Sequence, residues 1–261
     1  MQNLNYGVIG NCSTAALISE KGAIEWLCFP EFDSPSVFAA ILDRQKGGHF
    51  GFKVTSDYKV TQSYVPHTNI LSTHFESEEG AFDVVDFMPC YPTSDGKDFY
   101  RPAEIYRYIR WAKGRPRMKV DYRPAPNYAR GKTIYNVTSQ YVETYSSVEN
   151  KDRQYLYSSL DLKKVVNHDE ITLEKDEFFL FSFNEKVIPV DIEREKLEYC
   201  RTLVYWLNWT DHAKRYTRYN EVIERSMLVL KLMTYRNGAV MAAVTTSLPE
   251  TVGEVGNWDY R

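Results

Sequence analysis

The sequence lacks the features that mark a membrane or secreted protein. Its 261 residues include no apolar run of membrane-spanning length, and residues 1–6 show neither the basic segment nor the apolar stretch of a secretory signal. Cysteine is scarce and widely spaced, without a Cys-x-x-Cys pair: Cys12, Cys28, Cys90 and Cys200. We therefore expect reduced, mostly buried thiols, a cytoplasmic location and no membrane partner.

An excess of one charge sign is also missing. The chain has 32 basic and 35 acidic residues, interspersed along its length, and a net charge of −3. Nothing in this balance directs the protein to nucleic acid. Residues 107–130 are locally basic, but their Arg and Lys side chains follow strand alternation, which indicates a solvated sheet face.

Motifs of common catalytic and cofactor sites are absent from the sequence. There is no Gly-x-Ser-x-Gly, no phosphate-binding glycine loop and no dinucleotide fingerprint. His67 and His74 are out of phase on a strand and the other histidines are scattered, so we expect no metal site and no cofactor. Glu25 and Glu31 offer two carboxylates, but nothing in the sequence fixes the separation that glycoside hydrolysis would need.

Helical patterning is nearly absent before residue 190, whereas Tyr and Phe are abundant, at 20 and 13 residues. Strand alternation is clearest in 104–111, 133–138 and 177–183. Further candidate strands are 68–76, 81–87, 117–123, 140–145, 154–162 and 170–174. Because turn residues recur at roughly ten-residue intervals, we predict a mainly β fold, an antiparallel β-sandwich over residues 1–190.

The pattern becomes helical after Pro189. Residues 191–209 place apolar side chains at helical spacing behind an acidic first turn, which predicts an amphipathic helix. A second helix is predicted from about residue 220 to residue 236, ended by Asn237-Gly238.

This second helix is apolar nearly all round at its centre, residues 226–233. A helix that lies on a sandwich needs one apolar stripe only. Leaving four or five of these side chains in water would forfeit on the order of 10 kcal/mol. We therefore expect either self-association through residues 221–236 or a protein that continues past Arg261.

The last residues carry a possible ligand site. Behind a turn bracketed by two glycines come four chemically varied side chains: Trp258, Asp259, Tyr260 and Arg261. They supply a flat ring, an acceptor, a hydroxyl and a forked donor, which are the groups that bind a polyhydroxylated ring. The alternative is a polar tail at the chain end.

Six segments, in order along nearly the whole chain, carry a family likeness: Asn5–Ser19, Gly22–Asp43, Gly47–Phe50, Val84–Pro89, Arg225–Glu250 and Gly256–Arg261. They resemble family 15 glycoside hydrolases of the prokaryotic glucoamylase and trehalase-like type. The resemblance implies a β-sandwich over 1–190, a helical linker over 191–218 and, over 219–261, the first helix and incomplete start of an α/α six-fold barrel.

The resemblance also implies the chemistry of the parent protein. Family members hydrolyse α-glucosidic bonds with inversion, using one Glu as general acid and a second as general base. Both family glutamates lie downstream of the Trp-Asp-Tyr-Arg segment, so we assign no catalytic residue to this chain and expect it to be inactive alone. Its own role would be to support folding and assembly of the barrel, through which the parent binds an α-glucan or a trehalose-type saccharide.

Only residues at the end of this sequence match positions that contact the substrate in the family. Tyr260 matches a tyrosine that lines the glucose pocket of the family, and its flank is formed by Trp258, Asp259 and Arg261. A different hypothesis makes the Tyr-rich sandwich a carbohydrate-binding module in its own right. The five Trp residues form no evident row at sugar spacing, which favours the first hypothesis.

Residues 24–38 include a Pro-bounded loop with two acids, Glu31 and Asp33. One reading makes this loop a wall of the neighbouring barrel's site or an extra sugar contact. The reading that we favour is a strand followed by a helix, with Asp33 or Ser34 as N-cap and Pro35 in its first turn. Capping accounts for these residue types without any ligand.

Overall fold

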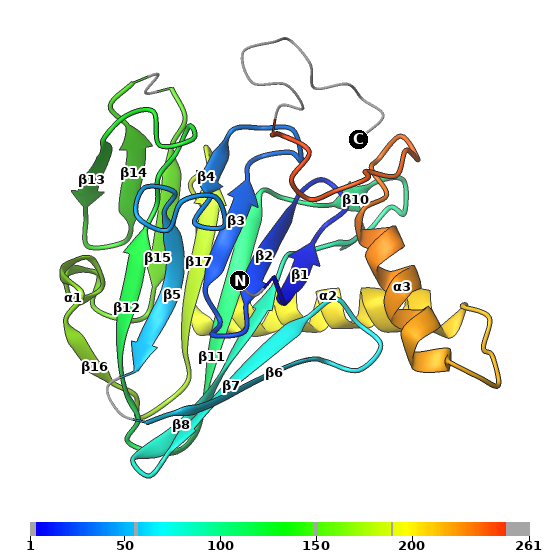
Figure 1. Cartoon of the computed structure of the whole chain (residues 1–261), viewed down its shortest axis with the longest axis horizontal. Coiled ribbons are helices and arrows are strands. Elements are labelled where there is room, and N and C mark those ends of the chain that lie inside the picture. Colours follow the sequence, from blue (N-terminus) through cyan, green and yellow to red (C-terminus); the bar gives the residue numbers. More distant parts are fainter. Residues whose placement is uncertain (1–3, 55–56, 149–150, 189, 249–261) are drawn as a thin grey trace.

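The computed structural model describes residues 4–54, 57–148, 151–188 and 190–248. Within these ranges two antiparallel sheets form a sandwich, and the two longer helices follow it along the chain (Figure 1). The prediction of a mainly β fold, a β-sandwich followed by helices, is confirmed.

The first sheet contains seven strands in the order β1-β2-β3-β5-β12-β16, with β4 paired to β3. Their bounds are β1 Tyr6–Gly10, β2 Ala15–Ser19, β3 Ile24–Cys28, β4 Ser36–Phe38, β5 His49–Val54, β12 Arg117–Arg123 and β16 Glu170–Thr172.

The second sheet contains eight strands in the order β13-β14-β15-β17-β11-β8-β7-β6. Their bounds are β13 Thr133–Val137, β14 Val142–Ser146, β15 Gln154–Ser158, β17 Glu177–Phe183, β11 Glu104–Gly114, β8 Gly80–Phe87, β7 Leu71–Ser77 and β6 Lys59–Tyr64. A separate small hairpin consists of β9 Tyr91–Pro92 and β10 Phe99–Tyr100.

Alternation along the strands divides the apolar side chains between two cores. On β8, Phe82 and Val84 pack between the sheets, whereas Val85 and Phe87 lie on the outer face that the helices cover. The inter-sheet core is rich in aromatic rings, and Phe75 stacks on Phe82 with 4.8 Å between ring centroids. The first sheet and the helices thus bury both faces of the central strands of the second sheet.

The prediction of a solvated basic face was wrong for Arg107. Its side chain is completely buried beside Asp86, because residue 107 shares the strand phase of Ile105 and Ile109, which belong to the inter-sheet core. Further along the same strand, Arg110 is exposed as predicted.

Three helices accompany the strands in the described ranges. The short α1, Leu162–Asn167, was not predicted; Asp161 caps its start and His168, with φ 58°, ends it in the left-handed region. The predicted amphipathic helix is α2, Ile192–Asp211, whose N-cap Asp191 accepts a hydrogen bond from Arg194 N at 2.8 Å. It lies across the outer face of the second sheet (Figure 1).

The helix α3, Asn220–Leu232, ends four residues before the predicted boundary. Thr234 forms a β-bridge with Val240, and Gly238, with φ 89°, supplies the turn between them. Asn237-Gly238 therefore turns a small hairpin and does not end the helix. The inner side of α3 packs against β1, where a Cβ on Gly10 would lie 2.7 Å from the backbone oxygen of Thr14 and 2.9 Å from Leu232 Cδ2, so this position requires glycine.

The helix predicted after Asp33 or Ser34 is also wrong. Residues 36–38 form β4 instead, pairing with Leu27 and Cys28, and all three of its side chains are buried. A strand places Val37 and Phe38 against the core, and this tertiary gain outweighs the local capping signal.

Candidate functional site

The predicted saccharide contacts Trp258, Asp259, Tyr260 and Arg261 lie outside the described residues. The chain is described up to Leu248, ten residues before Trp258. Two features near this end of the described chain and along the helices are candidates for function: a cleft beside α2 and a group of loops that holds residues 236–247.

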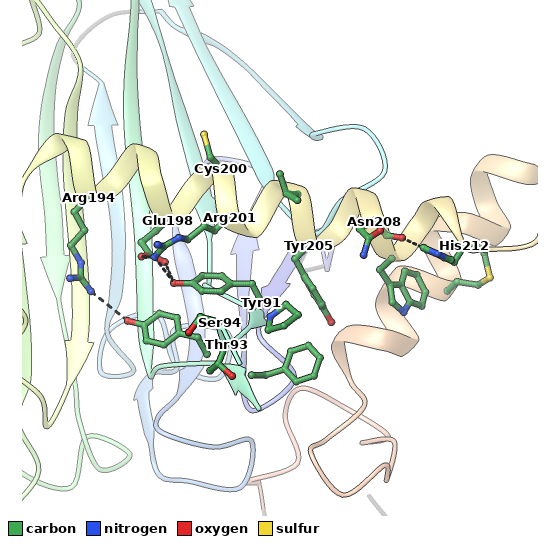
Figure 2. Close-up of a pocket in the computed structure, with 17 residues that line it drawn as sticks. Tyr91, Thr93, Ser94, Arg194, Glu198, Cys200, Arg201, Tyr205, Asn208 and His212 are labelled. Atoms are coloured by element: carbon green, nitrogen blue, oxygen red, sulfur yellow. Dashed lines mark hydrogen bonds and ion pairs between the residues drawn. The ribbon is translucent and has the colours of Figure 1, made fainter. Parts of the chain in front are cut away.

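The cleft runs between α2 and the hairpin β9–β10, with a volume of about 1360 Å³. Figure 2 shows Arg194, Glu198, Arg201 and Tyr205 projecting from α2, with Tyr91 facing Glu198 and Arg201. Aromatic rings supply much of its wall: Tyr91, Phe99, Tyr100, Tyr205 and Trp209. Such a mixture of rings and a few polar groups is typical of a binding surface.

Charges at the floor of the cleft are paired. Tyr91 donates a hydrogen bond to Glu198 Oε2 at 2.7 Å, and Arg201 Nη1 lies 3.3 Å from Glu198 Oε1. Burial and the Glu198 carboxylate both raise the pKa of Tyr91, which therefore stays a neutral donor. The arrangement fixes the Tyr91 ring and leaves it as a rigid wall of the cleft.

A second polar group lies deeper under α2. Arg194 Nε donates to Tyr106 Oη at 3.2 Å, and Tyr106 donates to Glu104 Oε2 at 2.9 Å. Glu195 is buried beside them, and its Oε1 has no hydrogen-bond partner among the described residues. Burial, with the nearby charge of Asp86, raises the pKa of Glu195 well above its usual range, so this carboxyl is held neutral.

Several aliphatic side chains are exposed on the outer surfaces of α2 and α3. On α3, Leu228 and Leu232 are buried, but Val222 and Leu230 are 66% and 57% exposed. Exposed aliphatic side chains continue along α2: Leu197, Val204 and Leu207. The sandwich therefore covers one side of the second predicted helix, and an aliphatic stripe on its other side is exposed to solvent.

The segment after α3 returns to the first sheet. Trp26 Nε1 donates to Val244 O at 2.8 Å, Cys28 Sγ lies 3.1 Å from Ser247 Oγ, and Tyr128 donates to Ser247 O at 3.1 Å. The chain that leads to the predicted saccharide contacts is therefore tied to β3 and to the loop around Tyr128.

The histidines and acids considered as ligands are separated. His67 pairs with Glu224 and His74 with Asp83, each at 2.7 Å. Within the described ranges, no group of three or more His, Cys, Asp or Glu side chains is placed to hold a metal ion. Helices in this part of the chain are also too short or too polar to cross a membrane.

Sequence reasoning missed the cleft because its walls come from segments a hundred residues apart. The available signal was the aromatic content of 91–100, where Tyr91, Phe99 and Tyr100 flank a turn-rich stretch. That signal predicts a hairpin, but nothing in the sequence aligns it with α2.

Comparison with known proteins gives a consistent result. A family model described as trehalase-like, N-terminal, matches residues 5–150. The chain is 32% identical over 255 residues to a trehalase of Thermoplasma acidophilum, covering 94% of this chain and 42% of the relative. It is 34% identical over 263 residues to trehalase 1 of Sulfolobus acidocaldarius, covering 98% of this chain and 42% of the relative. A trehalase of Mycobacterium tuberculosis is 28% identical over 288 residues, covering 98% and 41%. The chain thus spans about two fifths of the length of these curated relatives.

Proposed function

The chain belongs to the trehalase-like N-terminal family, and from this premise we propose that it is the non-catalytic N-terminal domain of a family 15 glycoside hydrolase. The parent protein would hydrolyse an α-glucosidic bond, in trehalose or an α-glucan. The observation that carries the proposal is the match of nearly the whole chain to about two fifths of several trehalases.

The role of the domain is to support folding and assembly of a catalytic α/α barrel. In this proposal α2 belongs to the linker, residues 191–218, and α3 is the first barrel helix within 219–261. The exposed stripe of Val222 and Leu230 supports this assignment. Burying a large aliphatic side chain stabilises by about 1.5–3 kcal/mol, so covering the stripe would add several kcal/mol to the assembled protein.

The chemistry would reside in the rest of the parent. Inverting hydrolysis needs a general acid and a general base about 6.5–9.5 Å apart with a water between them, and we place both glutamates beyond this chain. Tyr260 would contact the glucose ring, flanked by Trp258, Asp259 and Arg261. A cytoplasmic location and the absence of a cofactor stay predictions.

The first test is glucose release from trehalose, maltose and starch. We expect none from this chain and turnover from a protein that extends it to the full length of its relatives. Glucose release by the purified chain alone, persisting through further purification, would overturn the non-catalytic role. An extended protein that hydrolyses none of the three would overturn the proposed reaction.

The docking surface has its own test with a matched control. Leu230→Ser and Leu42→Ser change side chains that are 57% and 56% exposed in this chain. Neither should alter the melting temperature of the chain alone. In the extended protein Leu230→Ser should lower it and Leu42→Ser should not, because barrel packing would cover Leu230 only. Equal effects in both proteins would contradict the docking role, and a dimer of this chain that Leu230→Ser dissociates would support self-association instead.

The second candidate function, a carbohydrate-binding module, is favoured by the aromatic walls of the cleft. Calorimetric titration with trehalose and maltoheptaose tests it, with Phe99→Ala as the variant in the cleft and Trp111→Ala as the control; both rings are 40% exposed. Binding that only Phe99→Ala abolishes would establish the module. No heat with either sugar would exclude this function for the cleft.

A further inference from the structure

The buried face of α2 is polar along its first half and aromatic along its second. Glu195, Glu198 and Thr202 are the buried side chains of the first half, whereas Tyr205 and Trp206 fill the second. Among the described residues, Glu195 Oε1 and Thr202 Oγ1 have no hydrogen-bond partner. Because buried polar atoms without partners cost free energy, the first half of α2 is the more weakly attached part of the helix.

Acidic groups surround Glu195, which is 1% exposed. Glu198 lies near it one turn along α2, and the second sheet brings Glu104 of β11 and Asp86 of β8 into its surroundings. Within the described ranges Glu195 forms no ion pair. A negative charge on this carboxyl would therefore lie among other carboxyls and away from water.

The cations of this region are engaged by other groups. Arg194 Nε donates to Tyr106, and Arg194 Nη2 lies 3.9 Å from Glu104 Oε2. Arg107 pairs with Asp86 inside the sandwich, and Arg201 pairs with Glu198. The other titratable groups of the strands beneath the helix are phenols, which stay neutral at physiological pH: Tyr91, Tyr100, Tyr106 and Tyr108. The strand β17 adds Phe178 and Leu180 to this core, and neither side chain titrates.

Ionisation of Glu195 is therefore unfavourable while α2 lies on the sheet. The carboxyl belongs to the first turn of the helix, whose dipole favours a negative charge, but this effect is weak beside the loss of hydration of a buried carboxylate. Burial raises the pKa of Glu195 well above its usual range. When the first half of α2 leaves the sheet, Glu195 regains water and the ordinary glutamate pKa of about 4.3.

We propose that Glu195 makes the attachment of α2 to the sandwich depend on pH: its protonated carboxyl keeps the first half of the helix on the second sheet, and its ionisation releases that half. The attachment is strongest below the pKa of the released carboxyl, near 4.3. It weakens as the pH rises from there to the pKa of the buried carboxyl, and it changes no further above that value. This device acts on the helix itself, so it goes beyond the proposed function and does not depend on the bond that the parent protein hydrolyses.

Hydrogen exchange of the 261-residue chain between pH 5 and pH 7, corrected for the intrinsic exchange rate, tests the proposal. Opening that releases one proton becomes about tenfold more favourable per pH unit, so protection of peptides covering residues 192–203 should fall about tenfold per unit until the pH reaches the pKa of the buried carboxyl. Peptides from β11, residues 104–114, should keep their protection.

Two variants separate Glu195 from the acids around it. Glu195→Gln keeps the shape and cannot ionise, so protection of residues 192–203 should no longer depend on pH. The matched control is Glu193→Gln in the same turn, where the side chain is 76% exposed; its exchange should follow the wild type.

Three results would overturn the proposal. They are protection of 192–203 that is constant with pH in the wild type, the same pH dependence in Glu195→Gln, and an equal loss of protection in β11. If Glu195→Gln does not fold, the wild-type comparison of 192–203 with 104–114 decides alone. An extended protein that releases no glucose would overturn the proposed function and leave this result unaffected.

Discussion

The buried pair Arg107–Asp86 offers the sharpest test of what holds the sandwich together. Arg107 Nε donates to Asp86 Oδ1 at 2.7 Å and Nη2 to Oδ2 at 3.1 Å, between neighbouring strands of the second sheet. The same guanidinium donates to two carbonyls on the side of the first sheet, Phe50 O at 2.6 Å and Gly22 O. One side chain therefore bridges the two sheets, with no exposure to water.

The perturbation is Asp86→Asn, which removes the charge and keeps the shape. Burial raises the pKa of Asp86, and the Arg107 guanidinium opposes that rise. Each side chain therefore needs the other to remain buried at low cost in free energy. Breaking a buried pair by removing one partner costs about 3–5 kcal/mol, because the remaining charge is left uncompensated. Since Asn retains one acceptor oxygen for Arg107, we expect about 3 kcal/mol, a large fraction of a typical stability of about 5–15 kcal/mol.

Urea unfolding followed by tryptophan fluorescence measures the change in the free energy of unfolding. The control is Asp83→Asn, since Asp83 faces Arg110 across the same two strands at 3.1 Å, but both side chains are partly exposed. An exposed pair is worth about 0–1 kcal/mol. A cost below about 1 kcal/mol for Asp86→Asn, or equal costs for the two variants, would refute the assignment of Arg107 as the bridge between the sheets.

Two further predictions concern titration. Burial alone would raise the pKa of Asp121, but hydrogen bonds from Arg123, Lys53 and His49 hold this pKa well below its usual range. A carboxylate whose pKa is lower in the folded than in the unfolded protein stabilises the fold at pH values above the unfolded pKa, near 4, and this stabilisation is lost as the pH falls. Acidification from pH 6 to pH 3 should therefore lower the melting temperature less in Asp121→Asn than in the wild type. Equal decreases in the two proteins would contradict this. Burial raises the pKa of Cys28 to about 12, whereas Cys200 is exposed, so a thiol reagent at pH 8 should modify one cysteine rapidly in the native protein and four in denaturant. A second rapid thiol would refute the burial of the other three.

The sandwich could be predicted because alternation reports the burial of whole strands. The predicted strands 104–111 and 177–183 correspond to β11 and β17, which pair in the centre of the second sheet. The error at Arg107 came from assigning all the Arg and Lys side chains of the basic stretch to one solvated face, although residues 107 and 110 have opposite phases on the strand. Strand phase already placed residue 107 with Ile105 and Ile109, and Asp86, directly opposite on the neighbouring strand, supplies its partner.

The errors at the helices have a different cause. Asp33-Ser34-Pro35 is a good helix start by local chemistry, yet residues 36–38 pair with β3, because pairing across the sheet buries Val37 and Phe38. A capping signal is worth about 1 kcal/mol, less than the burial of two large side chains at about 1.5–3 kcal/mol each. For residues 36–38, pairing with β3 therefore outweighs the local signal for a helix.

The same correction decides what the loop before β4 can do. A helix starting at Ser34 would use Asp33 or Ser34 for capping and would direct Ser36 O along the helix axis. With β4 in its place, Ser36 O accepts a hydrogen bond from Tyr128 N, in the turn over residues 127–129 where φ is positive, and Glu31 of the preceding loop pairs with Arg236. The loop thus reaches the segment 236–247 through Arg236, 205 residues along the chain from Glu31, and the turn reaches the same segment through the hydrogen bond from Tyr128 to Ser247 O. Sequence patterning covers neighbours within one element, so a connection of this length becomes visible only when the fold brings the loop, the turn and the segment together.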